Sequence, residues 1–218
     1  MNPKEMLHYV DHTQLKAFAT WEDIRKLCEE AIEYQTASVC IPPCYIKRVY
    51  DAYGDKINIC TVVGFPLGYS VTAAKVAEVR QALADGAGEI DMVVNISDVK
   101  NGNIDAVREE ITTLKKETGD KTLKVIIETC YLTEEEKIAL CKAVTDAGAD
   151  FIKTSTGFGT GGATIEDIKL FKEHIGPEVR MKAAGGVKSV ADLEAFLNEG
   201  CARIGTSSAV ELVKKQDK

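Results

Sequence analysis

The sequence predicts a (β/α)8 barrel, or TIM barrel, formed as a single domain by residues 1–218. Short β-rich runs alternate with helical patterns along the chain, which is typical of a parallel sheet built from βα units. Eight such runs occur, and no linker or low-complexity stretch interrupts them. An open doubly wound sheet is the alternative, but no GxGxxG motif follows the first run.

The eight runs are short and rich in aliphatic and β-branched residues, as buried parallel strands are. Strands are expected at residues 7–11, 37–41, 57–63, 89–95, 123–129, 150–155, 179–184 and 202–207.

Helix signals fill most of the segments between these runs. Thr20 is a suitable N-cap, and Thr133 with Glu136 forms a capping box, a pattern that Thr164 and Asp167 resemble. Glycines follow several of the helical patterns, as they do where helices end. Helices are expected at residues 20–34, 70–87, 103–119, 133–149, 164–176, 189–200 and 208–216.

Composition and charge narrow the class of protein. Hydrophobic residues make up 45% of the chain, which is enough for a sizeable core, and the net charge is −7. That charge argues against nucleic acid as the main partner but allows a small anionic ligand at a local positive site. The start of the chain has no apolar signal-peptide region, and no apolar run is long enough to cross a membrane. We therefore expect a soluble, cytoplasmic protein.

The spacing of the cysteines and histidines does not predict a metal site. The number of cysteines is seven, their spacing is irregular and no CxxC pair occurs, so neither a disulfide framework nor a structural zinc site is expected. His8 and His12 are four residues apart, but they lie in an expected strand and turn, where helical ligand geometry does not follow.

Charged residues occur inside several of the apolar strands. Side chains alternate along a strand, so the parity that turns Ile90, Met92 and Ile152 toward the helices turns their neighbours into the barrel. The side chains expected to converge inside, near the carboxyl ends of four strands, are Asp91, Glu128, Lys153 and Lys182. Active sites of this fold lie at that end. The alternative is a structural ion-pair network that covers the core.

Two close lysines have a specific chemical use. A lysine amine is a nucleophile only when it is neutral, and a neighbouring cation together with partial burial favours the neutral form. Lys153 and Lys182 lie on adjacent expected strands, so one could attack a carbonyl while the other stays charged or helps to move protons with a carboxylate.

Glycine-rich loops after the last strands predict a phosphate site. In this fold such a site often forms after strands 7 and 8, where glycines allow close approach of the backbone and helix N-termini offer free N–H groups. The alternative is that these are ordinary βα turns. The candidate residues are Thr156, Gly157, Gly185, Gly186, Gly205, Ser207 and Ser208. Asp11 and Thr13, just past the first expected strand, are candidates for a substrate hydroxyl, and Cys40 is an inward-facing candidate or a core residue.

Together these segments resemble the deoxyribose-phosphate aldolase family. The resemblance rests on "VDHTQL", "SVCIPP", "TVVGFPLG", "EIDMVVN", "VIIETCYL", "DFIKTSTGF", "VRMKAAGGV" and "IGTSS", which occur in this order over nearly the whole chain.

The resemblance implies a class I, metal-free aldolase that needs no cofactor. Such an enzyme cleaves 2-deoxy-D-ribose 5-phosphate reversibly to acetaldehyde and D-glyceraldehyde 3-phosphate, in deoxyribose phosphate catabolism. It implies that Lys153 forms the Schiff base, that Lys182 perturbs it and joins proton transfer, and that Asp91 donates or accepts a proton. A homo-oligomer, dimer or tetramer, is compatible with it.

The chain differs from longer family members at its end, and two other functions are alternatives. Longer members of the family carry a terminal tyrosine implicated in proton transfer, whereas this chain ends "VELVKKQDK". A phosphosugar isomerase on the same fold would use Glu128 or Asp91 as a base without a covalent intermediate. A non-catalytic phosphate-binding protein is the third function.

Overall fold

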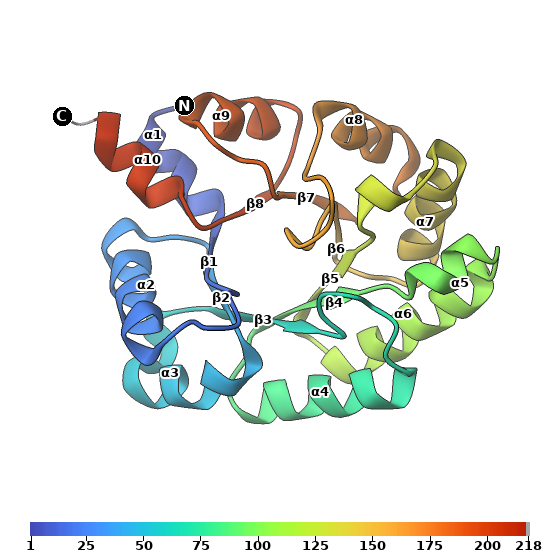
Figure 1. Ribbon diagram of the computed structural model, residues 1–218, viewed down its shortest axis with the longest axis horizontal. Helices are drawn as coiled ribbons and strands as arrows, with labels where there is room; N and C mark the ends of the chain where they lie inside the picture. The colour runs from blue at the N-terminus through green and yellow to red at the C-terminus, as the bar shows by residue number, and fades with distance from the viewer. Residues whose placement is uncertain (217–218) are drawn as a thin grey trace.

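The computed structural model, which describes residues 1–216, confirms the predicted barrel. Eight parallel strands close in the order β1-β2-β3-β4-β5-β6-β7-β8, with β8 paired to β1 (Figure 1). The strands are β1 (Val10–Thr13), β2 (Ser38–Ile41), β3 (Ile59–Val63), β4 (Glu89–Val93), β5 (Thr122–Ile126), β6 (Phe151–Lys153), β7 (Arg180–Ala184) and β8 (Arg203–Thr206). The closed order excludes the open doubly wound sheet.

Helices surround the strand ring and cover its outer face (Figure 1). The α-helices are α1 (Pro3–Met6), α2 (Trp21–Tyr34), α3 (Ile46–Tyr53), α4 (Thr72–Ala84), α5 (Ile96–Lys100), α6 (Ile104–Thr118), α7 (Glu134–Asp146), α8 (Ile165–His174), α9 (Val190–Asn198) and α10 (Ala209–Gln216). Short 3-10 segments are η1 (Leu7–Tyr9), η2 (Pro43–Tyr45), η3 (Gly54–Lys56) and η4 (Thr129–Tyr131).

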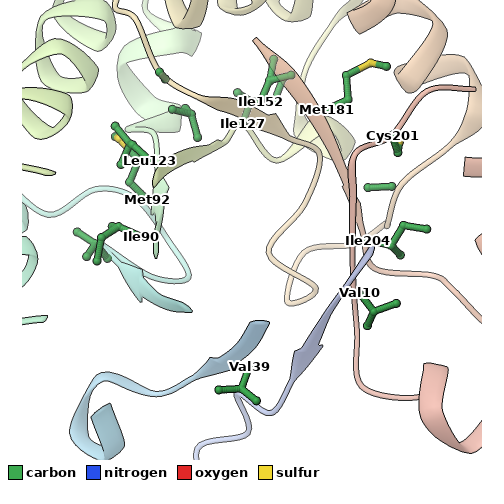
Figure 2. Close-up of a cluster of buried hydrophobic side chains, with 14 of the residues drawn as sticks. Val10, Val39, Ile90, Met92, Leu123, Ile127, Ile152, Met181, Cys201 and Ile204 are labelled. Carbon is green, nitrogen blue, oxygen red and sulfur yellow. The ribbon is translucent and has the colours of Figure 1, made fainter. Parts of the chain in front are cut away.

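The main hydrophobic core lies between the strand ring and the helices. Ile90, Met92, Ile152 and Ile204 belong to it, and Figure 2 shows strand side chains of this set on the outer side of the ring. The strand parity predicted from the sequence is therefore confirmed for Ile90, Met92 and Ile152, and the opposite parity is left for the barrel interior.

Side-chain caps fix where several helices begin. Thr20, Thr133 and Ser189 each form a complete capping box with the acidic residue three positions later, as predicted for Thr133. At α8 only half of the pattern forms: Thr164 accepts from the Asp167 N–H, but the Asp167 carboxylate pairs with Lys137 at 2.5 Å.

Three differences from the predicted elements have physical reasons. Residues 7–9 form a 3-10 turn, so the first strand begins at Val10 and runs to Thr13. The segment after β2 also contains α3, which the sequence did not reveal because prolines precede it and it is rich in aromatic and β-branched residues. α1 and α5 were missed because helices of four or five residues show no periodicity.

No helix within residues 1–216 is both long enough and apolar enough to cross a membrane. The last two residues of the "VELVKKQDK" end, Asp217 and Lys218, lie outside the described residues.

The cap of α7 can be tested with a matched pair of substitutions. Thr133→Ala removes the side chain that accepts from the Glu136 N–H, so we expect the free energy of unfolding to fall by about 1 kcal/mol. Thr112 is an exposed residue inside α6 whose hydroxyl donates to its own helix, so Thr112→Ala should change stability by no more than about 0.5 kcal/mol. Urea unfolding measures both, and equal losses would contradict the cap.

Candidate active site

Asp91 lies inside the barrel, and lysines from three other strands converge on it. The Nζ atoms of Lys153 and Lys182 each lie 2.7 Å from Asp91 Oδ2. Lys124 Nζ lies 2.8 Å from Asp91 Oδ1. All four side chains are buried. Strands β4 to β7 are consecutive neighbours in the barrel, which is why residues far apart in sequence share one carboxylate.

A second layer of charge supports this centre. Asp11 Oδ2 lies 2.5 Å from Lys182 Nζ, and Glu89 Oε2 lies 2.6 Å from Lys124 Nζ. The Arg203 guanidinium joins both carboxylates, at 2.5 Å from Asp11 Oδ1 and 2.8 Å from Glu89 Oε1. We call the whole group the ionic cluster: Asp11, Glu89, Asp91, Lys124, Lys153, Lys182 and Arg203.

The charges in the cluster stabilise one another against burial. Burial alone would raise the pKa of Asp91, but the charges of Lys124, Lys153 and Lys182 hold it well below its ordinary value. Burial alone would lower the pKa of Lys182, but Asp11 and Asp91 raise it above its ordinary value. Asp91 is therefore ionised and Lys182 protonated at neutral pH.

The remaining members follow the same rule. The Lys124 pKa is raised well above its ordinary value, because Asp91 and other nearby anions outweigh burial. The pKa values of Asp11 and Glu89 are lowered by the cations beside them despite burial. Three carboxylates thus face three fixed cations, and the charges balance without Lys153. The anions are Asp11, Glu89 and Asp91, and the cations are Lys124, Lys182 and Arg203.

A cavity of about 240 Å³ opens at the carboxyl ends of β1, β6, β7 and β8. Among the described residues, Lys153 is the member of the ionic cluster that lines this cavity. Its amine thus contacts the buried carboxylate on one side and the cavity on the other. The cavity is lined by Thr13, Gln14, Leu15, Lys16, Lys153, Thr156, Gly157, Phe158, Ala184, Gly185, Gly186, Val187, Gly205, Thr206, Ser207 and Ser208.

Backbone conformation explains two of the glycines in this wall. Gly185 and Gly186 have φ values of 78° and 79°, in the region that glycine alone adopts freely. Gly162 packs against them from behind, since a Cβ there would lie 2.5 Å from the Gly185 carbonyl carbon. The wall is therefore made of bare backbone, which lets a ligand approach the peptide groups closely.

Most of the predicted binding residues line this one cavity. They are Thr13, Thr156, Gly157, Gly185, Gly186, Gly205, Ser207 and Ser208. Thr156 differs in detail from the prediction, because both its N–H and its hydroxyl donate to the Glu128 carboxylate rather than being turned to a ligand.

The predicted position of Asp11 is wrong. It lies within β1, not past it, is fully buried in the ionic cluster, and is absent from the cavity wall. Cys40 is also fully buried, in a small inner cluster with Cys60 and Val62. Of its two predicted roles, this location agrees with the core residue.

Several residues of the site were missed from the sequence. Glu89 and Lys124 share the inward parity of Asp91 and of Ile126, so strand alternation could have identified them. Arg203 could have been found in the same way. The loop residues Gln14, Leu15, Lys16 and Phe158 carried no such signal, because loops have no periodicity.

Within residues 1–216, two groups of side chains have donor atoms close enough for a metal ion, but a cation already lies among them. The groups are Cys40, Cys60 and Asp91, and Asp11, Cys60 and Glu89. Lys124 Nζ lies 3.2 Å from Cys60 Sγ and is ion-paired with all three carboxylates. These residues therefore fit an ammonium group better than a metal. His12 is bonded to Glu30 at 3.0 Å instead of joining His8.

Known proteins match this chain over nearly its whole length. A family model described as DeoC/LacD family aldolase matches residues 5–209. The deoxyribose-phosphate aldolase of Clostridium botulinum (strain Alaska E43 / Type E3) is 71% identical over 100% of this chain and 98% of that protein. The protein of the same name from Clostridioides difficile (strain 630) is 60% identical over 98% of each chain.

A solved structure shares the fold closely. The deoxyribose phosphate aldolase of Aeropyrum pernix, described as having a unique tetrameric structure, has a TM-score of 0.91 and 30% identity. The match covers 99% of this chain and 92% of that one.

Acid and loss of one cation should both weaken the ionic cluster. The folded-state pKa values of Asp11, Glu89 and Asp91 are lowered, so their stabilisation is full above about pH 4 and is lost as the pH falls toward the folded-state values. Lys124→Met removes a cation from all three. It should lower the free energy of unfolding by about 3–5 kcal/mol at neutral pH and move acid unfolding to higher pH.

The matched control is Lys142→Met, which removes an exposed ion pair with Asp146 on α7. Its effect should stay within about 1 kcal/mol. Urea unfolding at several pH values between about 7 and 3 compares the two variants. A Lys124→Met protein as stable as the control would show that the cluster is not needed for folding.

Proposed function

Since this chain belongs to the DeoC/LacD family of aldolases, we propose that it cleaves 2-deoxy-D-ribose 5-phosphate reversibly to D-glyceraldehyde 3-phosphate and acetaldehyde. The observation that carries the proposal is the position of Lys153. Its amine lines the cavity while it is held 2.7 Å from a carboxylate that two further lysines share. A lysine placed in this way suits covalent catalysis on a carbonyl.

In the proposed reaction the neutral Lys153 amine attacks the C1 aldehyde of the open-chain sugar phosphate. Loss of water from the carbinolamine gives an iminium ion. The C3 hydroxyl then loses its proton, the C2–C3 bond breaks, and its electrons move to the iminium to give an enamine. Glyceraldehyde 3-phosphate leaves, and protonation at C2 followed by hydrolysis releases acetaldehyde.

The charge balance of the ionic cluster supports a neutral nucleophile. With Lys153 uncharged, three anions face three cations, so loss of its proton leaves no buried carboxylate without a counter-charge. We propose that Asp91, Lys182 and a water move protons together between Lys153 and the substrate, since both side chains lie beside the Lys153 amine. Lys182 also supplies a positive charge beside Asp91.

The opposite side of the cavity suits the phosphate group. The loops after β7 and β8 offer Gly185, Gly186, Ser207 and Ser208, and Lys16 from the neighbouring β1 loop adds a positive charge. Backbone N–H groups and hydroxyls at these positions can bind phosphate oxygens. We propose that the sugar phosphate spans the cavity from Lys153 to these loops.

The isomerase alternative is not supported. Its base would be Glu128 or Asp91, but the Glu128 oxygens are bonded to Thr156 and Asp91 is shared by three lysines. The matching relatives are named aldolases. Family membership also disfavours a non-catalytic phosphate-binding protein.

Three finer proposals accompany this function. The lysine route needs no metal and no organic cofactor, and the ammonium groups among the buried donors support metal-free chemistry. We propose a homo-oligomer, dimer or tetramer, supported by the tetrameric description of the Aeropyrum pernix relative. We propose a cytoplasmic location, supported by the sequence alone.

Substitution of the two lysines tests the proposed roles. Lys153→Leu should abolish aldehyde release from deoxyribose 5-phosphate, because the amine proposed to form the Schiff base is lost. Lys182→Leu should lower kcat by about 10²–10⁴-fold through disturbed proton transfer at Asp91. The exposed Lys172→Leu serves as the control and should keep full activity. Turnover by a folded Lys153→Leu protein, followed in a coupled aldehyde assay, would refute the assignment.

Lys16 should matter only for phosphorylated substrate. Because an exposed charge pair contributes about 1 kcal/mol, Lys16→Ala should raise KM for deoxyribose 5-phosphate by about fivefold with kcat little changed. KM for unphosphorylated deoxyribose should not change. Lys47→Ala, on α3 outside the cavity wall, is the control. Equal changes of KM for both sugars would place the phosphate elsewhere.

A further inference from the structure

Glu128 is a buried carboxylate with an unusual set of partners. It is 2% exposed, and among residues 1–216 it has no ion pair. The other buried carboxylates all have a cation within 4.0 Å: Asp11, Glu89, Asp91, Glu110 and Asp167. A buried charge without a counter-ion is costly unless hydrogen bonds compensate it. The groups that compensate the buried Glu128 carboxylate therefore indicate its role.

Most of the compensation comes from one residue in the loop after β6, and the Cys130 thiol adds a weak hydrogen bond to Glu128 Oε1 at 3.9 Å. Thr156 donates its N–H to Oε1 and Oε2 of Glu128 at 3.2 and 3.3 Å, and its hydroxyl donates a short hydrogen bond to Oε2. The Thr156 hydroxyl oxygen in turn accepts from the Phe158 N–H at 3.0 Å. The loop also passes close by, since a Cβ on Gly159 would lie 3.0 Å from Glu128 Cδ. The carboxylate thus fixes residues 156–159.

The backbone around Glu128 holds the start of the same loop. Ile127 N–H donates to the Lys153 carbonyl at 3.1 Å, and Thr129 N–H donates to the Thr154 carbonyl at 2.9 Å. Glu128 itself has φ 54° and ψ 66°, a left-handed conformation that is strained for a residue other than glycine. A strained residue between two anchored neighbours persists only where its surroundings require it.

We propose that Glu128 is the positioning residue for the Lys153 nucleophile and for the cavity wall that follows it. This inference rests on the proposed function. The backbone of its neighbours fixes Lys153 and Thr154, and its carboxylate fixes Thr156, so the whole segment from the amine to Phe158 is held by residues 127–129, which follow β5. A carboxylate suits this task because it only accepts, and its two oxygens receive both donors of one residue.

The position of the segment decides the chemistry of the first step. Lys153, Thr156, Gly157 and Phe158 all line the cavity, so a shifted loop changes where a carbonyl sits relative to the amine. A misplacement of about 1 Å can cost about 100-fold in rate. Loss of Glu128 should therefore slow formation of the Schiff base itself, and not only weaken binding of the phosphate.

The test follows Schiff-base formation with acetaldehyde, which has no phosphate. Enzyme and acetaldehyde are mixed, quenched with borohydride at increasing times, and the reduced adduct is measured by mass spectrometry. Glu128→Ala should form the adduct about 100-fold more slowly than the natural protein. Glu128→Gln should be slowed by only about tenfold, because its carbonyl still accepts the Thr156 N–H.

The matched control is Glu110→Gln, which disrupts a buried pair with Lys75 behind β4, outside the cavity wall. It should lower thermal stability but leave the rate of adduct formation within about twofold. A folded Glu128→Ala protein that forms the adduct at the natural rate would overturn the positioning role. If Glu128→Ala does not fold, Thr156→Val and Glu128→Gln carry the test, and natural rates in both would overturn it.

The experiment distinguishes failure of the proposed Schiff-base function from failure of the proposed role of Glu128. An adduct in the natural protein together with unchanged rates in the variants would refute the role of Glu128 alone. No adduct in the natural protein would refute the Schiff-base function and, with it, the positioning role.

Discussion

The sharing of one buried carboxylate by three lysines is the constraint on which the rest of the barrel interior depends. Asp91 cannot stay ionised inside a protein without counter-charges, and Lys124, Lys153 and Lys182 cannot stay buried without anions. The second layer of Asp11, Glu89 and Arg203 follows from this need. It brings the fixed charges into balance before Lys153 is counted, and Lys153 is the member that reaches the cavity. The ion-pair network and the candidate active site are therefore the same structure.

Barrel closure supplies the geometry that this arrangement requires. Consecutive strands bring Asp91 and the lysines to one interior position, and the contact between β8 and β1 places the Lys16 loop beside the glycine-rich loops. The site thus has two parts that differ in burial and in the groups that form them. The proposed covalent end is buried, charged and held by strands, whereas the proposed phosphate end is open and made of backbone, hydroxyls and one exposed lysine. The Glu128–Thr156 contact joins the two, because it holds the loop that leads from Lys153 to the cavity wall.

Alternation along strands explains how much could be predicted from sequence. It identified Asp91, Lys153 and Lys182 as inward residues, and it would have found Glu89 and Lys124 had every inward charge been followed. It wrongly placed Glu128 in the same set, although β5 ends at Ile126. It could not show that the first strand continues to Thr13 and buries Asp11 in the ionic cluster, because a 3-10 turn shifts the start of β1. It also could not show that Glu128 leaves the strand in a left-handed turn and takes the donors of Thr156. Both depend on contacts between distant segments, and so do the loop positions of Lys16 and Phe158.

We propose that Lys153 alone among the clustered lysines acts as the nucleophile. The direct measurement is to treat the natural protein with acetaldehyde and borohydride, digest it, and locate the reduced two-carbon group by peptide mass spectrometry. We expect the group on the peptide that contains Lys153, with Lys124 and Lys182 unmodified because their amines are held protonated by buried carboxylates. A modification on Lys124 or Lys182, or none at all, would contradict it.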